Sequence, residues 1–277
     1  MKYCLVLTDI PAIEKADEIL LEYNRKNLKI IDYIKEHSNQ RIILNISNLD
    51  EALQYKEIER LNAIYAENKL NFSIKLPKYN EKIKDLLSNL QIPFFFDWII
   101  TDWDELLGYI QLGVSDVYIG NNLGFELDKV AEVAHQNNVQ IRVFPNVAQS
   151  SWKETSGLKK FFIRPEDVTF YSDYVDVFEF WGADLKKQEI FYKIYSKQEW
   201  FGSLNEIIYE LNEELDSRYI IPRFAEKRVR CKKECLKGGK CQICDRIKEL
   251  SHTLEEAHII VDYNNKEDLN NGKRSEN

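Results

Sequence analysis

The stretch SDVYIGNNLGFELDKVAEVAHQNNVQIRVFPN (115–146) decides the fold prediction. Its first six and last eight residues are short apolar runs typical of buried strands. Between them, LDKVAEVAHQNN (127–138) carries apolar residues at helical spacing, which places four of them on one face: Leu127, Val130, Val133 and Ala134. A strand, a helix and a second strand in this order are typical of two parallel strands joined by a right-handed crossover.

Runs of the same kind recur on both sides of this unit and alternate with helical stretches. Eight strands are predicted, at 3–9, 41–47, 71–77, 92–100, 115–120, 139–146, 158–167 and 174–182. Helices are predicted near 12–37, 49–68, 79–90, 101–113, 127–138, 185–196 and 203–217. Because eight parallel strands with crossover helices close on themselves, the sequence predicts an α/β fold, a compact (β/α)8 TIM-like barrel. The alternative is an open doubly wound sheet of six or seven strands.

Composition and length set the domain prediction. The 277 residues, with a formal charge of −8, suffice for one large domain or two small ones. We predict an α/β barrel over 1–218, a cysteine module over 219–252 and a disordered polar tail over 263–277. The sequence contains no P-loop, no G-x-G-x-x-G and no H-E-x-x-H, which excludes the common nucleotide-binding loops and the zincins. Without a signal-like start or an apolar run of ~18 residues, no membrane contact and a cytoplasmic location are expected.

The cysteine module is the most specific chemical pattern in the chain. Four thiols follow the spacing C-x3-C-x5-C-x2-C, at Cys231, Cys235, Cys241 and Cys244. Four thiolates within so short a segment can close a tetrahedral structural site around zinc, and Gly238-Gly239 lets the chain reverse between the two pairs. An iron–sulfur cluster is the alternative, because four cysteines also hold one. Redox thiols without metal are the third interpretation.

The same module is strongly basic. Residues 223–246 contain nine Lys or Arg against three acidic residues, a local charge of +6. One interpretation is a nucleic-acid contact that binds phosphate groups through Arg228, Arg230, Lys232, Lys233, Lys237 and Lys240. The other is a solvated face whose cations offset the negative charge of a zinc tetrathiolate.

Candidate site residues follow from the barrel prediction, because such barrels carry chemistry at the carboxyl ends of their strands. The polar and aromatic residues expected there are Thr8, Asp9, Asn45, Ser47, Lys75, Asp97, Tyr118, Asn121, Asn146, Arg164, Glu166, Glu179 and Trp181. We select Arg164, Asn146 and Glu179 as catalytic candidates because they end the three clearest late strands. An Arg, a Lys and several carboxylates at one mouth suit a polar small molecule or a nucleotide-like group. The rival hypothesis is a non-catalytic scaffold or phage-associated structural protein, whose mouth its own side chains would fill.

Part of the chain resembles a known family. Residues 103–146, with Gly113, Asp116, Tyr118 and Gly120, resemble the start of the family once called collagenase-like peptidases. FFIRPEDVTFYSDYVDVFEFWG (161–182) and GKCQICDR (239–246) are similar to its later elements. The resemblance implies an iron–sulfur enzyme acting in RNA or quinone hydroxylation. The cysteine spacing differs from that of the family, so its cluster ligands do not transfer. The chain also resembles uncharacterised proteins of tailed bacteriophages.

The cysteine module generates the first test. We expect the purified protein to be colourless and to contain about one zinc per chain by elemental analysis. A strong chelator should melt the residues after about position 222 and spare the rest, because a segment this small has no core of its own. A brown protein that contains iron would contradict the zinc prediction and favour the hydroxylase-like interpretation.

Overall fold

The structure is a computed structural model of the chain. It describes residues 2–7, 17–23, 30–37, 39–68, 70–120, 122–149, 157–182, 185–211, 214–220, 223–229, 231, 244–246 and 248–249. The tail predicted at 263–277 and most of the predicted cysteine module lie outside these residues.

Nine strands form a single sheet in which every neighbouring pair is parallel. The sheet order is β5-β4-β3-β2-β1-β9-β8-β7-β6. The strands are β1 (Lys2–Leu7), β2 (Glu18–Glu22), β3 (Arg41–Asn45), β4 (Phe72–Leu76), β5 (Phe94–Phe96), β6 (Ile99–Ile100), β7 (Asp116–Ile119), β8 (Gln140–Val143) and β9 (Val177–Glu179). The α/β prediction is therefore confirmed.

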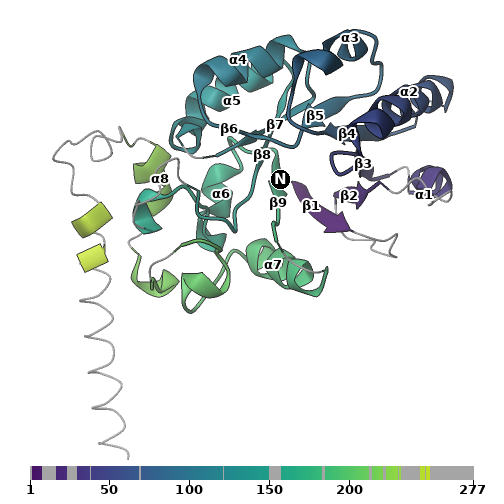
Figure 1. The fold of residues 1–277 in the computed structure, drawn as a ribbon. Coiled ribbons are helices and arrows are strands. Elements are labelled where there is room, and N and C mark those ends of the chain that lie inside the picture. The colour runs from purple at the N-terminus through teal and green to yellow at the C-terminus, as the bar shows by residue number, and fades with distance from the viewer. Residues whose placement is uncertain are drawn as a thin grey trace, which may run out of the picture.

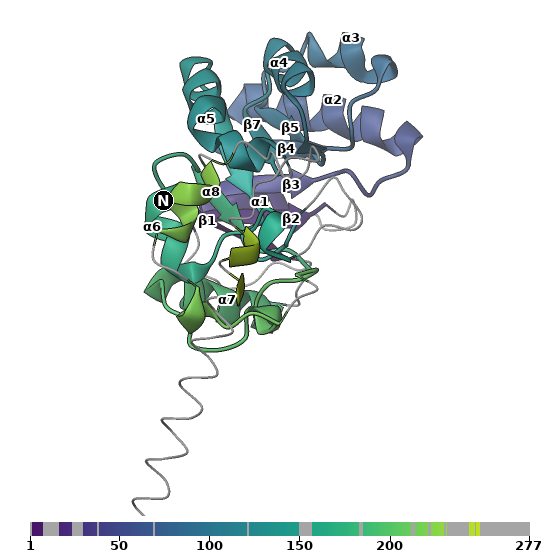
Figure 2. The ribbon, with the colours of Figure 1, turned by 90° about the vertical axis from the view of Figure 1, so that its left-hand side faces the viewer.

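Helices surround the strands (Figure 1). They are α1 (Ile30–Glu36), α2 (Glu51–Asn68), α3 (Lys84–Leu87), α4 (Trp103–Gln111), α5 (Leu127–Gln136), α6 (Val168–Tyr171), α7 (Leu185–Lys197) and α8 (Phe224–Val229). Short 3₁₀ turns lie at Glu81–Ile83, Leu123–Glu126, Gly157–Lys159, Pro165–Asp167, Leu204–Glu206 and Ser217–Tyr219. Helices α2 to α5 lie on one side of the strands and α7 on the opposite side, as the turned view also shows (Figure 2). Among the described helices, none has the length and apolar character needed to cross a membrane.

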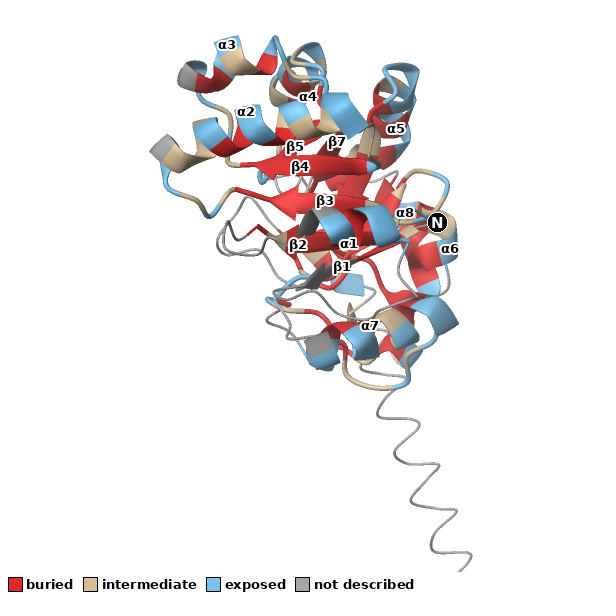
Figure 3. Cartoon of the chain, turned by 90° about the vertical axis from the view of Figure 1, so that its right-hand side faces the viewer, coloured by how far each residue is buried: buried red, intermediate tan, exposed pale blue. Residues whose placement is uncertain are grey.

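Local sequence signals explain the helices that were predicted correctly. The carboxylate of Asp102 accepts a hydrogen bond from the backbone N–H of Glu105, which caps α4 as its sequence indicates. Helix α5 buries Leu127, Val130 and Ala134 against the sheet. Figure 3 shows the general pattern, with buried strands and exposed outer helix faces.

Three predicted elements are wrong. The helix predicted near 12–37 is confirmed only at α1, because residues 18–22 form the buried strand β2, which pairs with β1 and β3. The strand predicted at 158–167 does not join the sheet, because its pairing is an isolated antiparallel bridge from Phe161 to Gln149 and Pro165 starts a 3₁₀ turn. The helix predicted at 203–217 consists of two 3₁₀ turns and a bridge between Ser203 and Asp216 in its described part.

The sheet is curled. Its two outermost strands, β5 and β6, are joined by only Asp97 and Trp98, so the two edges of the sheet lie together. The single strand predicted at 92–100 is thus broken at these two residues. The concave face encloses a small core of its own, to which six strands and the end of β8 contribute: Cys4, Leu20, Ile43, Phe95, Tyr118, Phe144 and Val177.

An ionic network crosses the concave face beside this core. The guanidinium of Arg142, on β8, is fully buried and pairs with Glu18 on β2, with Asp116 on β7 (Nε to Oδ1, 2.8 Å) and with Glu179 on β9 (3.4 Å). Arg41, on β3, binds both carboxylate oxygens of Asp116, at 2.8 and 2.6 Å. Since β3 and β7 are not neighbours in the sheet, these bonds span its interior.

Asp116 makes the stability of this network pH-dependent. Burial alone would raise the pKa of this carboxyl, but the charge of Arg142 and the hydrogen bonds and charge of Arg41 outweigh it and lower the pKa from 3.8 to about 2. A depressed folded-state pKa stabilises the fold above the unfolded-state pKa. That stabilisation is lost as the pH falls towards the folded-state value.

We therefore expect Asp116→Asn to lower the free energy of unfolding by about 3–5 kcal/mol at neutral pH, because two buried guanidinium groups lose their shared anion. This difference from the wild type should shrink by about 2 kcal/mol between about pH 5 and about pH 2. Urea unfolding of both proteins over this range measures it. A difference that does not change with pH would contradict the assignment.

Candidate functional site

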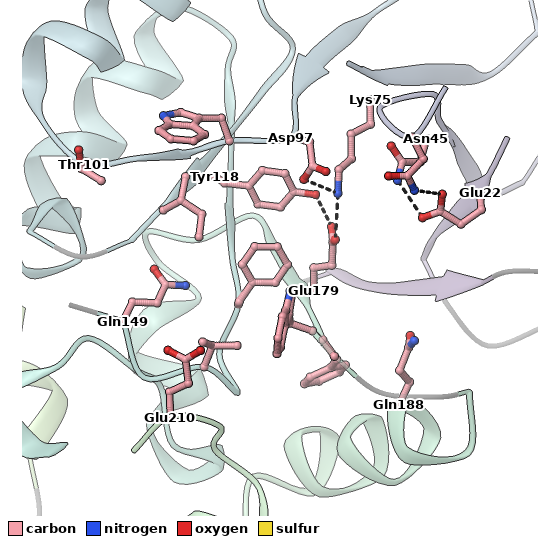
Figure 4. A pocket seen from close by; sticks show the side chains of 18 residues that line it. Glu22, Asn45, Lys75, Asp97, Thr101, Tyr118, Gln149, Glu179, Gln188 and Glu210 are labelled. Atoms are coloured by element: carbon pink, nitrogen blue, oxygen red, sulfur yellow. Dashed lines mark hydrogen bonds and ion pairs between the residues drawn. The ribbon is translucent and has the colours of Figure 1, made fainter. Parts of the chain in front are cut away.

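A cavity of about 900 Å³ opens at the carboxyl ends of the strands (Figure 4). The residues that end β2, β3 and β9 line it, together with the next-to-last residues of β4 and β7 and the residue after β5. These six residues are Glu22, Asn45, Lys75, Asp97, Tyr118 and Glu179. Because parallel strands place their carboxyl ends at one edge, residues far apart in the sequence meet here.

Lys75 lies at the centre of the polar floor. Its side chain is only 8% exposed, and its Nζ lies 2.9 Å from Oδ1 of Asp97 and 3.9 Å from Oε1 of Glu179. The ammonium also lies 5.1 Å from the centre of the Tyr118 ring, within cation–π range. Two carboxylates and an aromatic face thus hold one buried positive charge beside the cavity.

Glu179 joins this floor to the ionic network below it. Its Oε2 accepts hydrogen bonds from the phenol of Tyr118 at 2.8 Å and from Arg142 at 3.4 Å, whereas Oε1 faces Lys75. Burial, followed by the charge of Glu179, raises the pKa of Tyr118 well above its ordinary value of 10.0. The phenol therefore stays protonated and remains a donor to the carboxylate.

A second polar group lies at the ends of β2 and β3. The carboxylate of Glu22 accepts hydrogen bonds from the side-chain amides of Asn45 at 2.8 Å and Asn48 at 2.7 Å. Ser47 donates to the Asn45 amide oxygen at 2.7 Å and lies 3.2 Å from Oδ2 of Asp97. These bonds hold Glu22 and Asn45 in place at the cavity wall before any ligand binds.

Aromatic side chains form the less polar part of the wall. Phe144 stacks on Tyr118 with ring centres 4.9 Å apart and an angle of 11°. Trp181 is 49% exposed and packs edge-on against Tyr209. The exposed ring of Trp98 lies 3.4 Å from Nζ of Lys78. The cavity therefore offers flat apolar surfaces as well as charged groups.

The charges of the cavity are strongly unequal. One ammonium, that of Lys75, is set against four carboxylates: Glu22, Asp97, Glu179 and Glu210. The ionisable wall residues therefore carry a formal charge of −3.

The three catalytic candidates from the sequence have different positions. Glu179 lies on the cavity floor. Asn146 is fully buried behind the wall, where its amide exchanges two hydrogen bonds of 3.0 Å with the backbone of Trp181 and so fixes that residue. Arg164 does not line the cavity: it forms a bidentate pair with Asp167, at 2.7 and 2.8 Å, and stacks on Phe224.

The structure also locates residues that the sequence analysis did not select. Lys75 and Asp97 were expected at the mouth, but no motif distinguished them from the other strand-end residues. Gln149 lines the cavity from a connection whose structure the sequence did not predict. The feature that places Gln149 is its antiparallel bridge to Phe161, and no local sequence pattern reveals that bridge.

The cysteine module is described only at its ends. Cys231 and Cys244 are partly buried and pack against the edge of the main core, whereas Cys235 and Cys241 lie outside the described residues. Among the described residues, no group of three or more His, Cys, Asp or Glu is placed to hold a metal ion.

Arg228 corrects part of the nucleic-acid hypothesis. It is only 4% exposed, and its guanidinium donates to the backbone carbonyls of Phe162, at 2.9 Å, and of Lys160. A side chain that binds carbonyl groups inside the core is not accessible to a phosphate backbone. The other five predicted contacts lie outside the described residues: Arg230, Lys232, Lys233, Lys237 and Lys240.

Comparison with known proteins adds no assignment: no protein-family model matches the sequence, and no curated protein is significantly similar to it. The function of the chain is therefore inferred from the geometry of the cavity.

Arg164 provides a test of its structural position. Arg164→Ala should cost about 3 kcal/mol, and lower Tm by roughly 6–12 °C, because it leaves the largely buried Asp167 carboxylate without its partner. The matched control is Arg218→Ala, whose pair with Asp216 is half exposed and should cost under about 1 kcal/mol. Equal melting temperatures for the two variants would show that the Arg164 pair is not structural.

Proposed function

We propose that the curled sheet closes as an eight-stranded (β/α)8 barrel in which β5 and β6 are two halves of one strand. The first half pairs with β4 and the second with β7. Beside the first half, the backbone N–H of Ser115, just before β7, donates to the carbonyl of Phe94 at 2.8 Å. The cavity then lies at the mouth of the barrel, where folds of this class carry their active sites.

At this mouth, the protein binds an uncharged or cationic polar organic molecule and catalyses proton transfer on it. The observation that carries the proposal is the buried Lys75 ammonium, held between Asp97 and Glu179 on the floor of the cavity. The volume of about 900 Å³ is in the range of small-molecule sites. A scaffold protein would be expected to fill its mouth with its own side chains.

The negative charge of the cavity wall restricts the class of molecule that the cavity can bind. Four carboxylates against one ammonium repel phosphates and other anions, since like charges in a partly desolvated cavity are costly. Hydroxyl and amino groups instead suit carboxylate acceptors and amide side chains. This argues against a nucleic-acid strand or a phosphorylated metabolite in the cavity.

The floor residues supply an acid and a base. Oε1 of Glu179 takes a proton from the bound molecule, while the ammonium of Lys75 gives a proton to the atom that gains negative charge. Tyr118 fixes the carboxylate through its hydrogen bond to Oε2, and Asp97 orients the ammonium. The molecule loses one proton and gains one, and the proton on Oε1 of Glu179 then returns to Nζ of Lys75, 3.9 Å away, so an isomerisation or a proton exchange needs no further reactant.

We also propose that Cys231, Cys235, Cys241 and Cys244 bind a structural zinc ion. In support, the backbone N–H of Cys231 donates to the carbonyl of Arg228 at 2.9 Å, and Arg228 itself binds the carbonyls of Phe162 and Lys160. Cys244 Sγ lies 3.7 Å from the carbonyl of Leu158 in the same segment. The two ends of the motif thus meet one stretch of chain, as a shared ion would require.

The proton-transfer proposal can be tested by NMR in D2O with a defined panel. It contains ribose, glucose, glucosamine, putrescine, uridine and adenosine, beside ribose 5-phosphate, glucose 6-phosphate, UMP and AMP. We expect saturation transfer to at least one compound without phosphate, and weaker transfer to the phosphates because of the cavity charge. Over time, the wild type should exchange deuterium into the bound compound or convert it.

Three variants complete the experiment. Glu179→Gln removes the base. Asp97→Asn removes the carboxylate that orients the Lys75 ammonium, and the fold should tolerate this change because the Asp97 side chain is 42% exposed. Both should lower the rate at least about tenfold. Asp128→Asn on the exposed surface of α5 is the matched control and should leave the rate unchanged.

Binding only of phosphates, or no binding at all, would overturn the proposal. Binding without exchange in the wild type would overturn its catalytic part.

A further inference from the structure

A buried side-chain amide without a protein partner lies at the cavity wall. Gln149 is only 7% exposed, and among the described residues neither Nε2 nor Oε1 of its carboxamide has a hydrogen-bond partner. A buried donor and acceptor left unpaired typically cost about 1–3 kcal/mol each, so folded proteins rarely retain them without a reason. Because Gln149 lines the cavity, a bound molecule is the partner that would relieve this cost.

The backbone fixes the position of this amide. Gln149 exchanges two hydrogen bonds of 2.7 Å with Phe161, and the adjacent Ala148 donates to the carbonyl of Tyr209 at 2.8 Å. The chain at 148–149 is therefore held from both sides, and the side chain starts from a fixed point.

Gly120 makes room for the carboxamide. A Cβ at this position would lie 1.6 Å from Oε1 of Gln149 and 2.8 Å from Cγ2 of Ile99. Any other residue at 120 would displace the amide, so glycine keeps it in the wall of the cavity. Figure 4 shows Gln149 beside Glu210 on one side of the cavity, with Lys75, Asp97 and Glu179 on the other.

We propose that Gln149 recognises the edge of a planar heterocycle that carries a hydrogen-bond donor beside an acceptor, as an uncharged nucleoside does. A carboxamide offers one acceptor and one donor side by side, which matches such an edge in a bidentate pair. Trp181 and Phe144 supply faces for the ring, and the hydroxyl groups of the sugar reach the Lys75 and Glu179 end. This inference rests on the proposed function and names its substrate class.

The first measurement needs no ligand. Gln149→Met keeps the length of the side chain and removes both unpaired atoms, so Tm should rise by roughly 2–4 °C. The matched control, Gln136→Met on the exposed end of α5, should leave Tm unchanged. A lower Tm for Gln149→Met would mean that the amide has partners in the free protein, which would overturn the inference.

The second measurement compares matched nucleosides by calorimetry. Uridine and adenosine should bind the wild type at least about tenfold more tightly than 3-methyluridine and N6,N6-dimethyladenosine, which lack the donor. Gln149→Met should bind each pair equally, and Gln136→Met should behave as the wild type. Equal binding of methylated and parent nucleosides by the wild type would overturn the inference, as would discrimination that survives in Gln149→Met.

The two proposals fail in different ways. If ribose, glucose, glucosamine or putrescine binds and the nucleosides do not, the inference about Gln149 is wrong and the proposed function stands. If no uncharged or cationic compound binds, both are wrong.

Discussion

The bonds from Arg41 and Arg142 to Asp116 are the constraint on which the rest of the structure depends. They join β3, β7 and β8 across the interior of the sheet, and Glu18 and Glu179 extend the network to β2 and β9. Charges buried this deeply are tolerated only when each one meets an opposite charge in good geometry. A flatter sheet would separate β3 from β7 and leave the guanidinium groups unpaired. Curvature and charge pairing therefore require each other.

The same network determines what the cavity can do. Arg142 reaches Glu179 from below and occupies Oε2 together with Tyr118, so only Oε1 faces Lys75. The floor of the cavity is thus continuous with the stabilising interactions of the interior. The buried Arg142 and Tyr118 position the carboxylate of Glu179, whereas short-range bonds at the ends of two strands position the wall at Glu22 and Asn45.

Sequence patterns predicted the parallel α/β class, the cap of α4, the buried face of α5, and the placement of Glu179 at a strand end. They failed where tertiary contacts override local preference. Residues 18–22 were predicted as part of a helix although they form the buried strand β2, and 158–167 was predicted as a strand although Arg164 and Asp167 close a turn there. For the site, the sequence pattern placed Lys75 and Asp97 at the mouth but did not distinguish them from the other residues at strand ends. Only the structure shows that they form an ion pair, with 2.9 Å between Nζ and Oδ1. Gln149 carries no local signal at all.

The break between β5 and β6 makes the registers of these two strands independent, whereas one continuous strand would couple them. Strand β4 fixes the register of β5 and holds Asp97 as well, whose backbone N–H donates to the carbonyl of Leu76 at 2.6 Å. Strand β7 fixes the register of β6, so Trp98 is the residue of the link that belongs to neither ladder. A one-residue slip inside a strand would turn every side chain to the opposite face. At this link, the chain can gain or lose a residue without such a slip. Since Asp97 and Trp98 both line the cavity, it is the position at which evolution or engineering can change the size of the accepted molecule while leaving the interior unchanged.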